Sequence, residues 1–176
     1  MSSTMSEKLC ELPIATLMVL SLLIVSCSQR PADNSARAAA VNELYQTSRQ
    51  AFPDVPEITI AAAAGDDSAV FVDVREPAEI VVSRIAGAIS VAEFEAARSE
   101  YRDRQIVTYC TIGYRSGKYA EQLRNDGFEA YNLSGSILGW VHDRRELVDP
   151  DGKWIRRLHV YGRKWDLAPT QYETVW

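Results

Sequence analysis

One short segment of the chain combines a nucleophile with groups that favour negative charge. It consists of Cys110-Thr111-Ile112-Gly113-Tyr114-Arg115-Ser116 and follows the apolar run Ile106-Val107-Thr108-Tyr109, which predicts a buried strand. A helix is expected directly after it, over residues 116–126. Cysteine attacks as the thiolate, and thiolates form readily at a helix N-terminus or beside a cation. The segment therefore predicts nucleophilic chemistry at Cys110.

Three residues of the segment have expected supporting roles. Gly113 permits a turn with positive φ, so that backbone N–H groups of residues 111–116 converge on an anion. Arg115 keeps its charge and is available to the loop carbonyls or to a bound anion. Ser116 is expected to cap the following helix. A lone cysteine at a strand end is often only a small apolar core residue, so the prediction depends on the combination.

The surrounding elements predict an α/β domain in three layers, with a central parallel sheet of about five strands flanked by helices. Apolar, β-branched runs alternate with helical segments, which is typical of such a sheet. Ligands of open parallel sheets bind beyond the carboxyl ends of the strands, where Cys110 is placed. Strands are expected at residues 70–74, 89–91, 106–109 and 128–132, and helices at residues 77–83, 92–102, 116–126 and 136–142.

Further segments are expected on both sides of this domain, which is placed at residues 57–146. Residues 27–35 are polar and predict a flexible tether. Residues 36–56 predict a helix, capped by Ser35, and an extended lead-in. Residues 147–176 are rich in Trp and Arg and are expected to pack on the domain as a C-terminal extension. Such a stretch also suits a cover for the active site, a partner surface or contact with lipid headgroups.

The N-terminal residues predict an export signal. Residues 12–26 form a run of 15 residues without charge, shorter than the roughly 20 apolar residues of a membrane-spanning helix. The run ends in Ile24-Val25-Ser26-Cys27, which resembles the bacterial lipobox. The resemblance implies a signal peptide over residues 1–26, lipid on Cys27 and a membrane-anchored protein facing the periplasm or cell exterior. Ser28 after the cysteine favours the outer membrane; an uncleaved N-terminal anchor is the alternative.

The composition narrows the chemistry further. Of the three cysteines among 176 residues, Cys10 would be removed and Cys27 acylated, which leaves Cys110 as the one thiol and excludes an internal disulfide. The net charge of −5 and the lack of a dense basic stretch argue against nucleic-acid binding. His142 and His159 match no metal-ligand spacing, so neither a metal nor an organic cofactor is expected.

Three motifs occur in order over roughly residues 57–143. They are Asp73-Val74-Arg75-Glu76-Pro77-Ala78-Glu79 with Ile85-Ala86-Gly87-Ala88-Ile89, then Tyr109-Cys110-Thr111-Ile112-Gly113-Tyr114-Arg115-Ser116-Gly117, then Asn132-Leu133-Ser134-Gly135-Ser136 with Trp140. Together they resemble the rhodanese-like family: the first its Asp-x-Arg-Glu and Ile-x-Gly-Ala signature, the second its active-site loop and the third its Leu-x-Gly-Gly/Ser…Trp ending. The chain departs from the family at Arg84, where members often have His.

The resemblance implies a five-stranded parallel sheet and sulfur chemistry. In the family, the loop cysteine attacks a sulfane-sulfur donor and becomes a persulfide, which passes sulfur to an acceptor such as cyanide, a thiol or a partner protein. Thr111 to Ser116 would then bind substrate or anion, and Asp73 and Arg75 would support the structure by an ion pair. The alternative is a non-catalytic binding or redox-sensing module of the same fold.

Spacing within the loop separates sulfur from phosphate chemistry. Related folds that hydrolyse phosphate esters have five residues between Cys and Arg, whereas four lie between Cys110 and Arg115. The smaller ring of N–H groups suits one sulfur atom, and the loop holds no acidic residue for a general acid. Phosphatase and arsenate reductase activities are therefore disfavoured. Since Arg115 is the one cation in the loop, thiosulfate is expected to be a weak donor.

Overall fold

The computed structural model describes residues 31–176. The predicted signal peptide, the lipidation site Cys27 and the first part of the tether lie outside the described residues. Between residues 31 and 176, no helix has the length and apolar character needed to cross a lipid bilayer.

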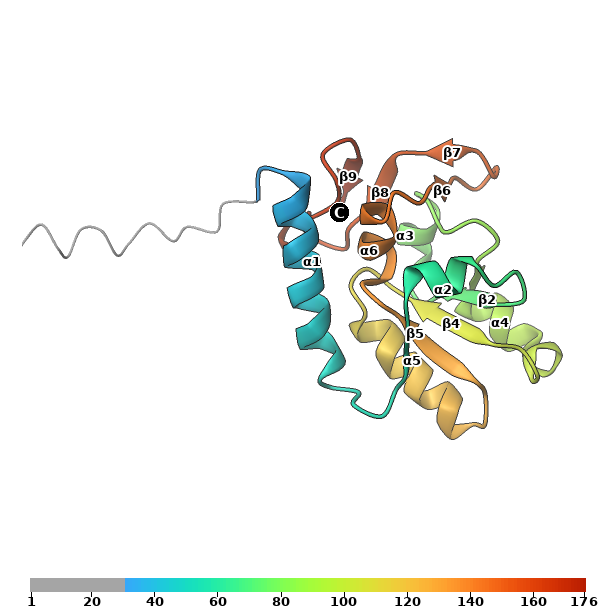
Figure 1. Ribbon diagram of the computed structural model, residues 1–176. Coiled ribbons are helices and arrows are strands. Elements are labelled where there is room, and N and C mark those ends of the chain that lie inside the picture. Colours follow the sequence, from blue (N-terminus) through green and yellow to red (C-terminus); the bar gives the residue numbers. More distant parts are fainter. Residues whose placement is uncertain (1–30) are drawn as a thin grey trace, which may run out of the picture.

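A five-stranded parallel sheet forms the centre of the molecule, with the strand order β1-β5-β4-β2-β3 (Figure 1). The predicted fold class is thus confirmed. Because every pair is parallel, the carboxyl ends of all five strands meet at one edge. The strands are β1 (Glu57–Ile58), β2 (Val70–Asp73), β3 (Ile89–Ser90), β4 (Ile106–Tyr109) and β5 (Ala130–Leu133).

Helices cover both faces of this sheet. On one face, Phe94 and Leu123 from the fourth and fifth helices pack in a cluster with Ile106 of β4. On the other face, helices one, two and six contribute to a second cluster that includes Val107. All four β4 side chains are buried, which explains their continuous apolar run. The helices are α1 (Asn34–Arg49), α2 (Ile60–Ala64), α3 (Pro77–Ile80), α4 (Val91–Ala96), α5 (Tyr114–Asn125) and α6 (Ser136–His142), with 3-10 helices η2 (Arg98–Tyr101) and η3 (Arg163–Trp165).

The start of α1 differs from the prediction. Asp33, rather than Ser35, caps this helix, because its Oδ1 accepts a hydrogen bond from the Ala36 N–H at 2.8 Å. Ser35 lies inside the first turn. The chain therefore becomes helical at Asn34, within the segment predicted to be a tether.

The start of α5 corrects the predicted role of Ser116. Gly113 adopts a φ of 116° and is the residue before the helix, which begins at Tyr114 rather than at residue 116. No side chain caps α5. Ser116 lies in the first turn, where its hydroxyl is free to bind atoms of the preceding loop.

Two other helices are shorter than predicted. Pro77 occupies the first turn of α3 as expected, but this helix ends at Ile80. Beyond it the chain is held by other contacts, since the Ser83 carbonyl accepts a hydrogen bond from Arg75 and the Ser83 hydroxyl donates to the Arg157 carbonyl. The helix predicted over residues 92–102 is divided into α4 and η2.

The C-terminal residues form two small sheets against the domain (Figure 1). Apolar side chains from this extension, among them Leu158 and Leu167, are buried in the same cluster as α1 and α6. Arg37 of α1 donates a hydrogen bond to the Ala168 carbonyl at 2.8 Å, which joins the two ends of the described chain. The strands are β6 (Leu147–Val148), β7 (Trp154–Ile155), β8 (Arg157–His159) and β9 (Glu173–Val175).

Candidate active site

The Cys110 loop lies at the carboxyl end of β4, the middle strand of the sheet. The strand ends at Tyr109 and α5 begins at Tyr114, so four residues connect them. The Cys110 side chain is almost fully buried, with 2% exposed, yet it lines a pocket of about 310 Å³. A small molecule that enters this pocket can therefore reach a sulfur atom that is otherwise shielded from bulk water.

Hydrogen-bond donors of the loop and helix surround the sulfur. The Gly113 N–H donates to Cys110 Sγ at 3.1 Å, and the Ser116 hydroxyl lies 3.5 Å from the same atom. The first N–H groups of α5 have no partner within the helix, and the helix dipole adds partial positive charge here. Gly113 and Ser116 thus contact the sulfur as the loop prediction requires, whereas binding of an anion by residues 111–116 stays a prediction.

These contacts favour the thiolate. Burial alone raises the pKa of Cys110, because a charged sulfur loses its hydration. The hydroxyl and backbone of Ser116, the Gly113 N–H and the charge of Arg115 act in the opposite direction and prevail, so that the pKa of Cys110 lies below its ordinary value. The loop therefore stabilises negative charge on a buried sulfur atom.

The strand and helix beyond the loop hold its shape. Asn132 of β5 accepts a hydrogen bond from the Ser116 hydroxyl at 2.7 Å and donates one to the Gly113 carbonyl at 2.9 Å. The Ser136 hydroxyl accepts a hydrogen bond from the Cys110 N–H at 3.2 Å. The next two N–H groups of α6 donate to loop carbonyls. The loop is thus bound on the side away from α5.

The N-terminal helix packs directly on the loop. A Cβ atom on Gly113 would lie 2.6 Å from Cδ2 of Tyr45, and one on Gly117 would lie 2.6 Å from Cδ2 of Phe52. Real Cβ atoms do not tolerate such contacts. Glycine at Gly113 is required twice, once for its φ of 116° and once for the close approach of Tyr45. The helix that precedes the predicted domain is therefore part of the site.

Arg115 binds a carboxylate that the sequence analysis did not assign. Its Nη1 and Nη2 donate to the two Glu79 oxygens at 2.6 and 2.9 Å, and Nη2 also donates to the Thr111 hydroxyl at 3.1 Å. Burial raises the pKa of Glu79. The Arg115 guanidinium and the hydrogen bond from the Glu76 backbone N–H have a larger effect in the opposite direction, so the pKa of Glu79 lies below its ordinary value. The guanidinium, expected at the loop carbonyls or an anion, is instead neutralised by Glu79.

Asp73 and Arg75 form a separate, fully buried ion pair. Arg75 Nε and Nη2 donate to the two Asp73 oxygens at 2.9 and 2.6 Å, and the Tyr109 hydroxyl donates to Asp73 Oδ2 at 2.6 Å. Neither residue lines the Cys110 pocket. Their contacts fix the ends of β2 and β4 and the Ser83 turn rather than a substrate.

The pocket itself combines three parts of the chain. Gly113 and Ser116 contact the sulfur but do not line the pocket, whereas the other predicted loop residues do. One lining residue comes from α1 and two aromatic residues come from the C-terminal extension. The described residues that line it are Ser48, Cys110, Thr111, Ile112, Tyr114, Arg115, Tyr161 and Trp165.

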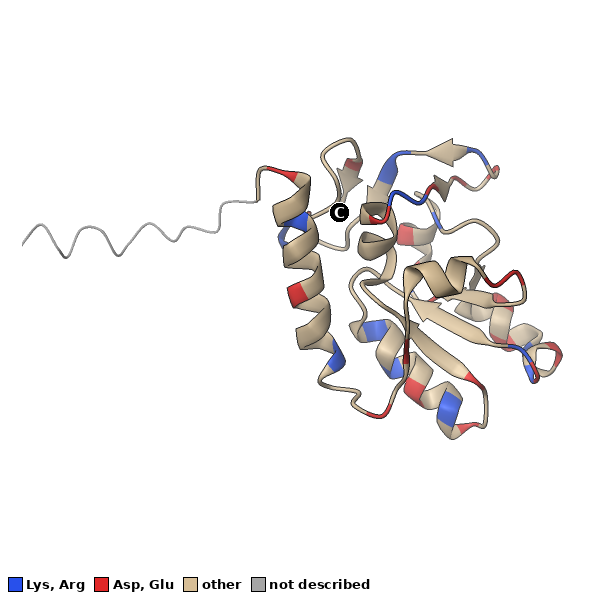
Figure 2. Ribbon diagram, viewed as in Figure 1, with Lys and Arg blue, Asp and Glu red and all other residues tan. Residues whose placement is uncertain are grey.

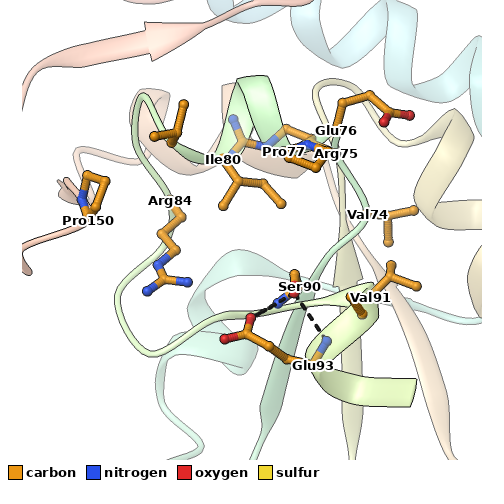
Figure 3. A pocket seen from close by; sticks show the side chains of 12 residues that line it. Val74, Arg75, Glu76, Pro77, Ile80, Arg84, Ser90, Val91, Glu93 and Pro150 are labelled. Carbon is orange, nitrogen blue, oxygen red and sulfur yellow. Dashed lines mark hydrogen bonds between the residues drawn. The ribbon is translucent and has the colours of Figure 1, made fainter. Parts of the chain in front are cut away.

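A larger hollow of about 760 Å³ lies between α3 and the start of α4, at the ends of β2 and β3 (Figure 3). Ile80, Val74 and Val91 face it, and Arg84 points toward Glu93, whose side chain caps α4. Cys110 does not line this hollow. Although this hollow is larger than the Cys110 pocket, it does not contain the candidate nucleophile, so we do not assign the reaction to it.

Sequence reasoning missed four residues that shape the loop: Tyr45, Glu79, Asn132 and Ser136. Three of them lie in the quoted motifs without an assigned role. A polar Asn132 within an apolar strand and a Glu79 three residues into a short helix were the available signals. Tyr45 gave only the signal of an apolar helix stripe.

No metal centre is found in the described part of the chain, since residues 31–176 hold no suitable group of three or more His, Cys, Asp and Glu side chains. His142 makes a hydrogen bond to the Leu167 carbonyl at 2.8 Å. His159 accepts one from the Tyr161 N–H at 3.1 Å. His142 thus joins α6 to the extension, and His159 holds a turn within the extension.

Comparison with known proteins agrees with this geometry. The sequence model of the Rhodanese-like domain family matches residues 59–143. A sulfurtransferase of Allochromatium vinosum is 32% identical over 93 residues, which cover 51% of this chain and 87% of that protein. The chain belongs to the rhodanese-like family.

Other relatives are larger than the matched region. A tRNA uridine(34) hydroxylase of Acholeplasma laidlawii is 27% identical over 120 residues, which cover 62% of this chain and only 37% of that protein. The crystal structure of a thiosulfate sulfurtransferase from Pseudomonas aeruginosa matches with a TM-score of 0.50 and 23% identity, over 69% of this chain and 24% of that one. The structural match supports the shared fold.

Replacing Ser116 by Ala is expected to slow the alkylation of Cys110 by iodoacetamide below the pKa of the thiol. The single proton of the Ser116 hydroxyl is shared between Asn132 Oδ1 at 2.7 Å and Cys110 Sγ at 3.5 Å. Its loss should therefore lower the thiolate fraction several-fold, which is less than the roughly tenfold effect of an undivided hydrogen bond to an ionised group. Rates measured across a pH series report this change. Ser48→Ala is the matched control, because Ser48 lines the same pocket but donates to the Leu44 carbonyl. Equal rates in both variants would contradict the assigned hydrogen bond.

Proposed function

We propose that this protein is a sulfurtransferase or persulfide carrier that moves sulfane sulfur through Cys110. The observation that carries the proposal is a buried cysteine whose sulfur accepts a hydrogen bond from the Gly113 N–H, lies 3.5 Å from the Ser116 hydroxyl and has a lowered pKa. Membership of a family with sulfurtransferase relatives supports it.

The proposed reaction is a pair of displacements at sulfur. The Cys110 thiolate attacks the outer sulfur of a donor, a new S–S bond forms, and the old bond breaks with its electron pair on the remaining donor fragment. The terminal persulfide sulfur then carries the negative charge within reach of the loop N–H groups. A nucleophilic acceptor, such as a thiol or cyanide, removes that sulfur and restores the thiolate. The balance needs no metal and no organic cofactor.

The pocket suits sulfur transfer better than phosphate-ester hydrolysis. Among its described lining residues there is no Asp or Glu to protonate a leaving alcohol. Arg115, which would bind phosphate oxygens, is engaged by Glu79 through two hydrogen bonds. These contacts add to the four-residue spacing between Cys110 and Arg115.

The hydroxylase relatives do not change this proposal. Their name describes a reaction on tRNA, and this chain spans 37% of the Acholeplasma laidlawii protein. The present chain carries a net charge of −5, and the Lys and Arg residues of the described part are interspersed with Asp and Glu (Figure 2). Such a distribution is unlike the basic face of a nucleic-acid-binding protein.

We further propose that the domain is held at a membrane outside the cytoplasm by lipid on Cys27. The proposal is supported by the apolar run at residues 12–26 and the lipobox-like Ile24-Val25-Ser26-Cys27. Six residues separate Cys27 from Asn34, where α1 begins, and an extended chain of that length spans roughly 20 Å. The domain and its sulfur acceptor would then meet close to the lipid surface.

Mass spectrometry of the purified domain after exposure to a sulfane-sulfur donor tests the persulfide. The wild-type protein is expected to gain one sulfur atom that a thiol or cyanide removes, and Cys110→Ser is expected to gain none. Peroxide is the second treatment, because the redox-sensing alternative predicts oxygen at Cys110 and no sulfur from any donor. That second pattern would refute the sulfurtransferase.

Labelling with radioactive palmitate in a Gram-negative host tests the lipid. The wild-type protein should incorporate label, and Cys27→Ser should lose it, because the acyl chains require that thiol. Cys10→Ser is the control and should keep the label, since the signal peptide is removed after Ser26. Label that persists in Cys27→Ser, or is missing from the wild type, would refute the anchor.

A further inference from the structure

Two aromatic residues of the C-terminal extension form one wall of the Cys110 pocket. Tyr161 and Trp165 line it together with Cys110 and Ile112. Both lie outside residues 59–143, the part that matches the Rhodanese-like domain family. The extension thus adds to the reaction site a surface that the family motifs do not specify.

Tyr161 has a backbone conformation that is unfavourable for an aromatic residue. Tyr161 has a φ of 66°, which aromatic residues rarely adopt, and its N–H donates to His159 Nδ1 at 3.1 Å. The ring stays 58% exposed and lies over the Arg115 guanidinium, 4.8 Å from its central carbon. Strained residues persist where the surrounding structure demands them, and they concentrate at functional sites.

The same arrangement leaves the described part of the pocket without an unpaired cation. Among the described residues that line the pocket, Arg115 is the one with a charged side chain. Its terminal nitrogens are bound to Glu79 and its face is covered by Tyr161. A dianion that enters must lose hydration without gaining an ion pair, which is costly. An organic group next to the sulfane sulfur would instead pack on apolar and aromatic surface.

We propose that Tyr161 and Trp165 select donors in which the sulfane sulfur is attached to an organic group, and disfavour thiosulfate. The inference deepens the proposed sulfur transfer and rests on it. With a thiosulfonate, R–SO₂–S⁻, the Cys110 thiolate attacks the terminal sulfur, the S–S bond breaks, and the sulfinate R–SO₂⁻ leaves with the electron pair. The products are the Cys110 persulfide anion and one sulfinate, so atoms and charges balance. The group R occupies the space between the two rings and Ile112.

Two matched donors test the selection. Benzenethiosulfonate and thiosulfate present the same sulfonyl-bound sulfur, but a phenyl ring in the first replaces a charged oxygen in the second. The variants are Tyr161→Asn, because Asn tolerates positive φ, and Trp165→Leu. Trp154→Leu is the control, since Trp154 is an exposed tryptophan of the same extension that does not line this pocket. Steady-state kinetics with cyanide as acceptor give kcat/KM for each pair.

The wild type is expected to use benzenethiosulfonate at least tenfold better than thiosulfate, since about 1.4 kcal/mol of added contact corresponds to a factor of ten. Tyr161→Asn and Trp165→Leu should each lower kcat/KM for the aryl donor several-fold and leave kcat/KM for thiosulfate equal or higher, whereas Trp154→Leu should change neither. An unaltered donor ratio in both pocket variants would overturn the selection. Equal losses with both donors, at an unchanged rate of Cys110 alkylation, would also overturn it.

The outcome separates this inference from the function beneath it. Persulfide formation with both donors at similar rates would leave the sulfurtransferase standing and remove the role of the aromatic wall. If neither donor gives a persulfide on Cys110, the sulfurtransferase itself is refuted, and the donor selection with it.

Discussion

The site depends on hydrogen bonds to one buried sulfur atom. Without them, burial would keep Cys110 protonated and inert. The Gly113 N–H at 3.1 Å, the hydroxyl and backbone of Ser116 and the charge of Arg115 reverse that tendency. The left-handed conformation of Gly113 lets α5 begin at the next residue, so that Ser116 lies in its first turn close to the sulfur. The φ angle of Gly113 thus helps to place the groups that lower the pKa of Cys110.

Several distant segments hold that conformation. Asn132 of β5 binds the Gly113 carbonyl and the Ser116 hydroxyl, and Tyr45 of α1 fills the space that a side chain at Gly113 would need. Glu79 of α3 fixes Arg115 on the opposite side. The loop is therefore preformed before a donor arrives, which is the condition for efficient electrostatic stabilisation. The cost is that Arg115 is neutralised and gives little help to a dianionic substrate.

The sequence predicted the fold class and the position of the Cys110 loop at the end of β4 because both have strong local signals. A continuous apolar run marks β4, and the pattern of Cys110, Gly113 and Arg115 marks the loop. The contacts around the loop have no such signal, since they join residues far apart in the chain, such as Tyr45 with Gly113 and Glu79 with Arg115. The cap of α5 was mispredicted for a related reason: Ser116 has the residue type of a cap, but a glycine with positive φ had already ended the loop. The aromatic wall of the pocket could not be predicted, because nothing local ties Tyr161 to Cys110.

The most direct test follows the backbone amides of the loop by nuclear magnetic resonance as the pH is varied. The Gly113 and Ser116 amide protons are expected to shift with a single titration that coincides with the ionisation of Cys110. In Cys110→Ser this titration should be absent while the rest of the spectrum stays folded. If the chemical shifts of these amide protons do not change with pH in the wild type, or change equally in Cys110→Ser, the loop backbone does not bind the sulfur anion.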